Sequence, residues 1–231
     1  MAKSMKANFI KGFYANIPVG FSVMAYGLVL GILAGNKDVT LFELIFMNLA
    51  TFAGSAEFLM VELWNDPLPF VQILIAVFAV NLRYLLVGAS LTPLFKGKSV
   101  LHKATMMHLV ADENWAVTMS RLKNEKITPY FLLGGGICLL IFWTVGTLSG
   151  HQFGALISNP YSLALDFVII IIFTGLAMSF YEGKSSILPW VVAGAMAYLF
   201  FILIPGKWYI VLGGLSGSLV YAYQKSQEAK K

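Results

Sequence analysis

The chain has 231 residues, of which 58% are hydrophobic and 12% are charged, and its formal net charge at neutral pH is +5. Soluble domains carry about 25% charged residues, so half that charge and a mean hydropathy of +0.78 exclude a soluble globular protein and indicate a membrane protein. The lysines lie in short segments between apolar runs, which is typical of membrane-protein loops and argues against a nucleic-acid partner.

Eight apolar runs follow one another along the chain. They cover residues 18–34, 41–64, 70–95, 105–119, 130–149, 163–180, 187–204 and 208–223. A spanning helix needs about 20 apolar residues, and the alternating pattern of membrane strands is absent. The sequence therefore predicts an all-α polytopic integral membrane protein with six to eight hydrophobic helices, of which one or two are broken or re-entrant.

No polar stretch is long enough to fold by itself, so a single transmembrane domain over residues 1–231 is expected. Lysines precede the first apolar run, as in a signal peptide, but no cleavage site of small residues follows them. We therefore interpret the first run as an uncleaved membrane anchor. The expected division is a cytoplasmic tail over residues 1–13, a membrane-embedded part over 14–223 and a second cytoplasmic tail over 224–231.

The distribution of basic residues indicates which runs cross the membrane. If the runs 41–64 and 105–119 enter the membrane and return to the same side, 13 basic residues lie on one side and two, Lys37 and Lys207, on the other. If both runs cross, the division is ten against five. The rule favours six full spans and two re-entrant segments in the cytoplasmic membrane, with both termini cytoplasmic. A count of seven or eight spans stays open, because the run 41–64 is long enough to cross.

The run 41–64 contains the small-residue stretch Ala53-Gly54-Ser55-Ala56, followed by a carboxylate, Glu57. Glycine in a helix interior costs up to about 1 kcal/mol, so a break is expected here. Inside a membrane, non-helical backbone persists where it is buried in protein or lines a wet cavity, and broken helices expose backbone groups to substrates in many transporters. Gly54, Ser55 and Glu57 are therefore predicted to bind substrate.

A second polar group, Asn81 and Arg83, lies near the middle of the run 70–95. Arg83 is 11 residues from Leu94, or about 16 Å along a helix, which is too far for its side chain to reach the membrane surface. A charge at the centre of a spanning helix costs about 2.5–3.5 kcal/mol. Arg83 therefore needs water or a partner, for which Asp112 and Glu57 are the candidates. Asn81 and Arg83 are predicted to bind substrate, and a purely structural brace is the alternative for Arg83.

A third polar group, Asp112-Glu113-Asn114, interrupts the run 105–119. Two carboxylates and an amide on a short apolar segment are suited to carrying a coupling proton or lining a substrate pathway. We predict these roles for the three residues and for Glu57. The alternative is that Asp112 and Glu113 lie at the cytoplasmic surface, since basic residues follow a few positions later.

Enzyme motifs are absent. The sequence has no H-E-x-x-H zinc motif, no G-x-S-x-G elbow, no Walker A loop and no metal-binding spacing of cysteine and histidine. Ser55 and His108 as a proteolytic dyad would be two isolated residues and a weak signal. We therefore expect no enzymatic activity, no catalytic residue, no metal and no cofactor, and the energy for transport must come from a gradient or from a separate subunit.

Four motifs together resemble the AzlC family, the large subunits of branched-chain amino-acid exporters (LIV-E). They are P-V-G-F-S-V-M-A-Y-G-L-V-L-G from Pro18, F-A-G-S-A-E-F, V-N-L-R-Y with a following G-A-S-L, and A-D-E-N-W-A-V, within a resemblance that extends from Tyr14 to Tyr223. The family commonly has glutamine where this chain has Glu57 and histidine where it has Tyr84. The resemblance implies proton-driven export of leucine, isoleucine, valine and sometimes methionine, with a small AzlD-type four-helix membrane subunit as partner.

A mechanism for a zwitterionic amino acid follows from these residues. The half-helix after Gly54 and Ser55 offers backbone N–H groups to the substrate carboxylate, while Glu57 or Asp112 accepts the ammonium group or carries the coupling proton. Arg83 keeps these carboxylates away from lipid. Three other functions remain open: a membrane scaffold or assembly subunit without transport activity, a transporter of a different small amino acid, and a channel.

Overall fold

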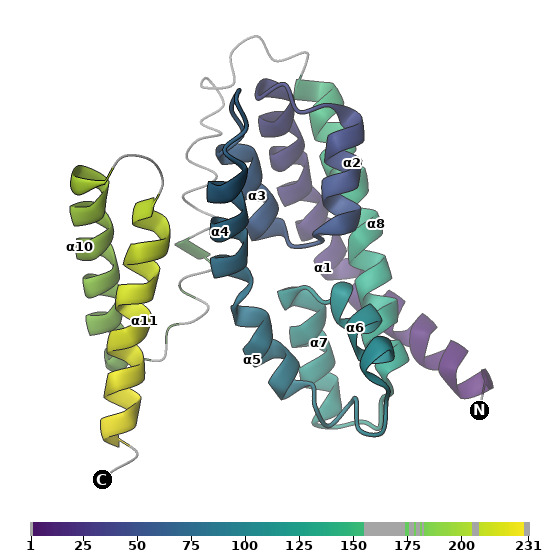
Figure 1. Cartoon of the computed structure of the whole chain (residues 1–231). Helices are drawn as coiled ribbons and strands as arrows, with labels where there is room; N and C mark the ends of the chain where they lie inside the picture. Colours follow the sequence, from purple (N-terminus) through teal and green to yellow (C-terminus); the bar gives the residue numbers. More distant parts are fainter. Residues whose placement is uncertain are drawn as a thin grey trace. The chain divides into compact units, whose positions relative to one another are not determined.

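The structure is a computed structural model in which residues 2–154, 174–175, 178, 181, 183–204 and 208–228 are described. Every regular element in this part of the chain is helical, as predicted (Figure 1). The elements are α1 (Ala2–Asn36), α2 (Leu41–Ala50), α3 (Gly54–Glu62), α4 (Phe70–Asn81), α5 (Arg83–Ser90), α6 (Val100–His108), α7 (Asp112–Leu122), α8 (Pro129–Gly154), the 3-10 helix η2 (Lys184–Ser186), α10 (Ile187–Leu203) and α11 (Trp208–Glu228). The predicted run 163–180 lies almost wholly outside the described residues.

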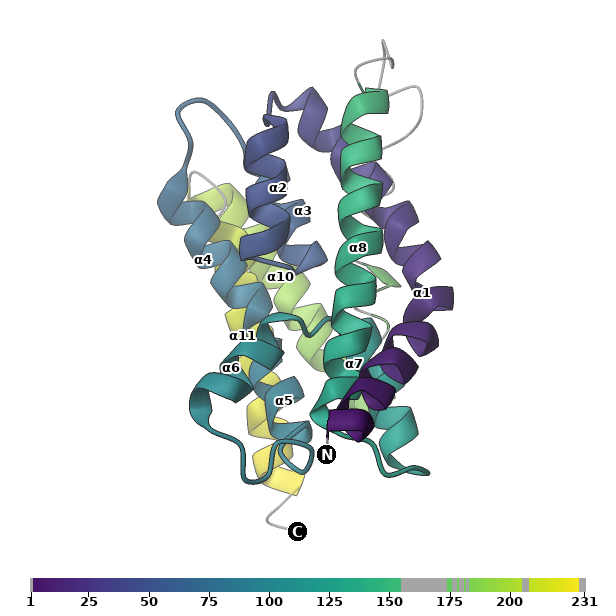
Figure 2. The ribbon, with the colours of Figure 1, turned by 90° about the vertical axis from the view of Figure 1, so that its right-hand side faces the viewer.

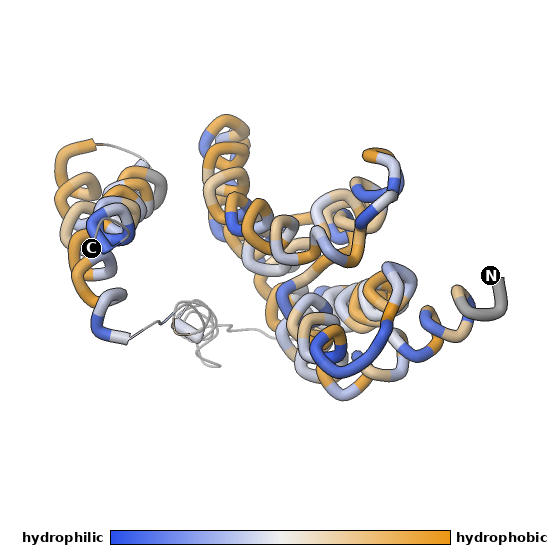
Figure 3. The backbone as a smooth tube through the Cα atoms, turned by 90° about the horizontal axis from the view of Figure 1, so that it is seen from below, coloured by the Kyte–Doolittle hydropathy of each residue, from blue (hydrophilic) through white to orange (hydrophobic). Residues whose placement is uncertain are grey.

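Four segments of the described chain are long and apolar enough to cross a membrane. They are Met5–Asn36, Phe70–Ser90, Pro129–Gly154 and Lys184–Leu203. The first of them begins well before the predicted run 18–34, because α1 already starts at Ala2 and includes most of the expected N-terminal tail. Apolar residues predominate along the helices (Figure 3), and large side chains such as Phe42, Leu86 and Phe201 remain exposed. Such surfaces are expected where helices face lipid or another membrane subunit.

The chain forms two compact units. One consists of Met1–Asn65 and Asn81–Leu165, and the other of Asp66–Val80 and Asp166–Lys231. In the second unit, α10 packs on α11, where a Cβ atom at Gly213 would lie 2.6 Å from the Cβ of Ala197. The first unit contains all the residues that the sequence predicts for a functional site.

The first unit is built on the close pairing of α1 with α8 (Figure 2). Glycines on both helices allow this approach, because a Cβ atom at Gly31 would fall on the carbonyl oxygen of Thr147 and one at Gly150 on that of Leu28. Small residues of this kind let helices pack at short range within a membrane, where association depends on van der Waals contact. The pair provides the frame against which the shorter helices are placed.

The helices α2 and α3 form a re-entrant hairpin. With ten and nine residues, they are about 15 Å and 14 Å long, or half the thickness of a membrane core. The break between them covers residues 51–53, with a positive φ of 41° at Phe52. The Nζ of Lys37, which precedes α2, donates to the carbonyl oxygen of Glu62 at the end of α3, at 3.3 Å. The chain therefore returns to the end at which it entered (Figure 1).

The helices α6 and α7 form a second re-entrant hairpin, which enters from the opposite end (Figure 2). Its break covers residues 109–111, and its helices have nine and eleven residues. The first hairpin contacts the C-terminal half of α8, at Trp143 and His151, whereas the second contacts the N-terminal half, at Leu132 and Gly136. Both irregular runs therefore fold back as hairpins of short helices, which is the arrangement that the count of six full spans predicts.

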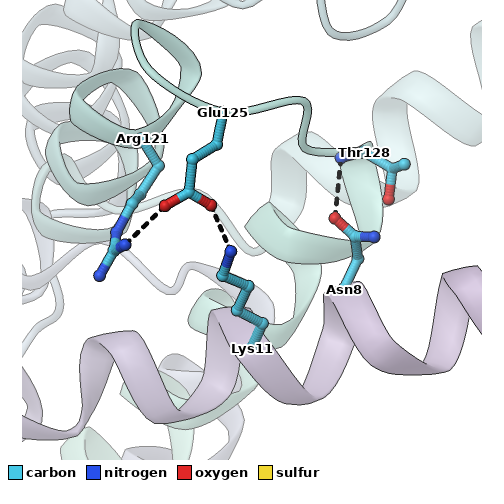
Figure 4. Close-up of polar contacts among 5 residues, drawn as sticks. All are labelled: Asn8, Lys11, Arg121, Glu125 and Thr128. Atoms are coloured by element: carbon cyan, nitrogen blue, oxygen red, sulfur yellow. Dashed lines mark hydrogen bonds and ion pairs between the residues drawn. The ribbon is translucent and has the colours of Figure 1, made fainter.

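Polar contacts tie the outer end of the second hairpin to α1 (Figure 4). Glu125, in the loop between α7 and α8, forms an ion pair with Lys11 and accepts a hydrogen bond from Nη1 of Arg121 at 2.8 Å. The backbone N–H of Thr128 donates to Oδ1 of Asn8 at 3.1 Å. These contacts hold the loop against the first turns of α1.

Candidate functional site

The tips of the two hairpins meet at one arginine. Arg83 is the first residue of α5, Ser55 the second residue of α3 and Asp112 the first residue of α7. Nη2 of Arg83 donates to Oγ of Ser55 at 2.7 Å, and Nη1 lies 2.9 Å from Oδ2 of Asp112. Of the two partners predicted for Arg83, the structure therefore gives Asp112, and it adds Ser55.

The hydrogen bonding of Arg83 is incomplete. Its side chain is 13% exposed and that of Asp112 is 31% exposed. A guanidinium has five N–H groups, yet Nε and Nη1 are buried without an aligned acceptor in the described structure, so the contact of Nη1 with Asp112 is an ion pair without a directed hydrogen bond. A buried donor without a partner costs about 1–3 kcal/mol, and these N–H groups remain available to a further acceptor.

Two other contacts keep the hairpin tips and α5 in place. Nε2 of His108, at the end of α6, lies 2.8 Å from the carbonyl oxygen of Leu49 near the end of α2. Because a carbonyl oxygen only accepts hydrogen bonds, this nitrogen carries the proton. The indole Nε1 of Trp115 on α7 donates to Oγ of Ser90 on α5 at 2.8 Å. The second contact joins the first turn of α7, which begins at Asp112, to the last residue of α5, the helix that begins at Arg83.

Glu57 closes the first hairpin break and has no exposed surface. Its Oε1 accepts a hydrogen bond from the backbone N–H of Ala53 at 3.1 Å, and its Oε2 accepts one from Nε1 of Trp143 on α8 at 3.0 Å. Glu57 therefore satisfies one of the donors that a helix start leaves unpaired and attaches the start of α3 to α8. Both oxygens are occupied by protein donors, and within the described residues Glu57 has no ion pair.

The break lies earlier than the sequence indicates. It was expected within Ala53-Gly54-Ser55-Ala56, with free N–H groups following Ser55, but the non-helical residues are 51–53 and α3 already begins at Gly54. Gly54 has a packing role, because a Cβ atom there would lie 3.2 Å from Cη2 of Trp143. The missing side chain allows the indole to approach Glu57.

A polar stripe on α8 holds the whole first hairpin. Trp143, Thr147 and His151 follow at intervals of four residues and therefore lie on one face of the helix. Oγ1 of Thr147 accepts from Nδ2 of Asn48 on α2 at 2.7 Å, and Nε2 of His151 lies 2.7 Å from the carbonyl oxygen of Val39, just before α2. Sequence reasoning missed these residues, and the regular spacing of hydrogen-bonding side chains in an apolar helix was the available signal.

Asn114 closes the second hairpin break as Glu57 closes the first. Its Oδ1 accepts from the backbone N–H of Ala111 at 2.8 Å, and its Nδ2 donates to the carbonyl oxygens of Leu109 and Leu132 at 2.9 and 3.3 Å. The amide therefore joins the break to α8 with every polar atom satisfied.

The remaining predicted residues lie close to these contacts. Glu113 is half-buried and forms no ion pair among the described residues, and Oδ1 of Asn81 is buried without a partner there. Asp112 and Glu113 both belong to the first turn of α7, at the tip of the second hairpin. In the part of the chain that the structure describes, no group of three or more His, Cys, Asp or Glu side chains is arranged to hold a metal ion.

The chain is similar to known proteins over most of its length. A family model described as AzlC protein matches residues 18–157. An uncharacterized membrane protein of Archaeoglobus fulgidus is 26% identical over 223 residues, which cover 94% of this chain and 95% of that protein. No solved structure matches the chain.

Proposed function

Because the chain belongs to the AzlC family and its helices are those of a membrane protein, we propose that it exports branched-chain amino acids by secondary active transport. Leucine, isoleucine and valine are the proposed substrates, with methionine as a further one, and the proton gradient supplies the energy. The protein has no enzymatic role in this proposal. Its partner is a small four-helix membrane subunit of the AzlD type.

The observation that supports transport most directly is the meeting of two half-length hairpins at Arg83. Each hairpin helix is about half as long as a membrane core is thick, so tips that enter from opposite ends meet near the middle. Interrupted helices at this depth are how many transporters present polar groups to a substrate. A scaffold has no need for a buried arginine whose N–H groups lack acceptors, and this favours transport over the scaffold.

The predicted residues receive roles that fit their contacts. We assign substrate binding to Arg83 and to the neighbouring Gly54, Ser55 and Asn81, with the proton pathway at Asp112 and Glu113. Glu57 and Asn114 belong to the same pathway, and each also closes a hairpin break.

The proposed location is the cytoplasmic membrane with both termini cytoplasmic. Two re-entrant hairpins correspond to the division of 13 basic residues against two, which follows the positive-inside rule. In a Cys138→Ser background, a cysteine replacing Lys37 is expected to react with a membrane-impermeant maleimide applied to intact cells, and a cysteine replacing Lys98 is not. The reverse pattern would contradict this orientation.

The function is tested by efflux of preloaded radiolabelled leucine, valine and methionine. Cells express this chain with and without the small subunit, each in the presence and absence of a protonophore. Saturable efflux that needs both chains and stops with the protonophore is expected. If no substrate leaves although both chains are detected in the membrane, the export proposal is wrong. If Arg83→Gln lowers only the amount of assembled protein and leaves the flux per molecule unchanged, the scaffold alternative is favoured.

A further inference from the structure

We propose that the Arg83–Asp112 ion pair is itself the binding site of the zwitterionic substrate, and that a proton and the substrate ammonium group compete for Asp112. The α-carboxylate would bind the N–H groups of Arg83 that have no acceptor, and the ammonium group would bind the carboxylate of Asp112. This inference rests on the proposed function and specifies how substrate and proton share one site.

The guanidinium of Arg83 has N–H groups without an aligned acceptor in the described structure. Nη2 is bonded to Ser55, while Nε and Nη1 are buried and have no aligned acceptor in the described structure. A carboxylate is the acceptor that arginine pairs with most strongly, commonly through two parallel hydrogen bonds. A substrate carboxylate at Arg83 would therefore satisfy groups that are otherwise buried at a cost.

Asp112 has Arg83 as its polar partner among the described residues and remains accessible. Its contact with Nη1 of Arg83 is not aligned as a hydrogen bond, no other hydrogen bond to its carboxylate occurs within the described residues, and its side chain is 31% exposed. An ammonium group has three donors and no acceptor, so it replaces the guanidinium as the partner of this carboxylate. The ion pair can thus open without leaving Arg83 or Asp112 unpaired, because each gains a charged group of the substrate as its partner.

Charge balance explains why the site would select a zwitterion. The empty pair is neutral, and it stays neutral when a neutral zwitterion is inserted with its carboxylate at Arg83 and its ammonium at Asp112. An amine without a carboxylate, or an acid without an ammonium, leaves one member of the pair uncompensated inside the membrane, where an unpaired charge is costly. The aliphatic side chain of the substrate is uncharged and does not alter this charge balance.

A proton on Asp112 removes the charge that binds the ammonium group. The titratable and charged groups around Asp112 are Arg83 and Tyr84 on α5 and Glu113 on α7, while His108 at the end of α6 is bonded to a backbone carbonyl. With Asp112 neutral, the arginine remains and the ammonium group is repelled. Substrate and proton then bind in alternation, which is what export against an inward flow of protons requires.

The test measures binding to the full chain, co-purified with the small subunit, in lipid nanodiscs. Bound radiolabelled leucine is displaced by unlabelled leucine, by 4-methylpentanoate, which lacks the ammonium group, and by isopentylamine, which lacks the carboxylate. Each single-charge analogue is expected to bind the native protein more weakly than leucine by about tenfold or more. Equal displacement by either analogue would overturn the inference, and this comparison needs no variant.

The Asp112→Asn variant is expected to change the affinities for leucine and for 4-methylpentanoate in opposite directions. Its affinity for leucine is expected to fall by about tenfold or more and to lose its decrease at acidic pH, while 4-methylpentanoate is expected to bind more tightly than it does to the native protein, because Arg83 is no longer paired. A merely structural role of Asp112 would not improve binding of the anion. Asp38→Asn is the matched control, since φ at Asp38 is 57° and asparagine tolerates that conformation.

The outcomes separate this inference from the proposed function. If leucine binds and is exported, but Asp112→Asn changes neither leucine affinity nor anion affinity, the ion pair is not the substrate site and export stands. If the native protein neither binds nor exports any amino acid, the proposed function is wrong and this inference falls with it.

Discussion

Replacing Trp143 by phenylalanine removes the N–H group that α8 offers to Glu57. Nε1 of Trp143 donates at 3.0 Å to a carboxylate that has no exposed surface. A hydrogen bond to a charged group contributes about 1.5–3 kcal/mol, and the buried oxygen that loses its donor adds a desolvation cost. Phenylalanine leaves an aromatic ring beside Phe58, whose ring centroid lies 6.4 Å from that of Trp143. We expect Trp143→Phe to lower the free energy of unfolding by about 2–3 kcal/mol.

Trp115→Phe is the matched control, because it deletes the same indole N–H from a different environment. Nε1 of Trp115 donates at 2.8 Å to a neutral hydroxyl, Oγ of Ser90, and the contact is only partly buried. A neutral hydrogen bond contributes about 1 kcal/mol, so a smaller loss is expected. Unfolding in mixed micelles with increasing sodium dodecyl sulfate, followed by circular dichroism, gives both free energies under the same conditions.

The reasoning is refuted if the two variants lose equal stability, or if Trp115→Phe loses more. A double-mutant cycle with Glu57→Gln makes the test specific. Glutamine has one acceptor oxygen and one N–H₂ group, so it cannot accept from both Ala53 and Trp143 through separate oxygens. We expect Trp143→Phe to cost at least about 1 kcal/mol less in the Glu57→Gln background than in the native one. Additive losses would mean that the two side chains do not interact directly.

Three further predictions concern the packing of α1 and α8, the first hairpin and the loop after α7. Gly31→Ala places a Cβ atom on a backbone carbonyl oxygen of α8 and is expected to cost at least about 1–3 kcal/mol. Gly35→Ala is the control, because the nearest atom to a Cβ there is 3.4 Å away. Equal melting temperatures of the two variants would contradict the close helix pairing. Asn48→Ala removes an amide that donates to α8 at 2.7 Å and is expected to cost about 1 kcal/mol in the same detergent titration, and unchanged stability would show that this bond contributes nothing. Hydrogen bonds from Lys11 and a neighbouring arginine lower the pKa of Glu125 from its ordinary value of 4.5, so their stabilisation is complete above that value and is lost as the pH falls through the lowered pKa of the folded state. The protection of this loop from hydrogen exchange, measured relative to the intrinsic exchange rate at each pH, is therefore expected to fall on acidification in the native protein and to change little in Glu125→Gln. An identical pH response in both would contradict the role of the carboxylate.

The sequence predicted that the second apolar run is broken, but it did not give the position of the break. Gly54 and Ser55 indicated it, because small residues weaken a helix. The left-handed conformation falls instead on Phe52, with φ of 41°, and phenylalanine gives no sign of this conformation in a sequence. The hydrogen bonds of Glu57 to Ala53 and Trp143 close the break from a distance, so its position depends on tertiary contacts as well as on local propensity.

The partner of Arg83 was predictable only as a choice between two residues. The depth of an arginine in an apolar run shows that it needs a partner, and Asp112 and Glu57 both qualified. Only the opposed entry of the two hairpins places Asp112 at the arginine and turns Glu57 toward α8. Trp143 was missed because tryptophan in an apolar run is usually a packing residue, and the partner that makes its N–H important lies 86 positions away in the chain.

The two hairpin breaks are closed by the same geometry but by different chemistry, which explains why a carboxylate lies in an apolar run. Oδ1 of Asn114 and Oε1 of Glu57 each accept from the backbone N–H at the start of their helix. The amide of Asn114 also donates to two carbonyl oxygens, so its closure is complete at any pH. Glu57 is surrounded by two donors, Ala53 and Trp143, and suits them only while both oxygens accept, because a protonated carboxyl group would direct an O–H toward donors. The closure of the second hairpin by Asn114 is therefore independent of pH, whereas the closure of the first depends on the charge of Glu57.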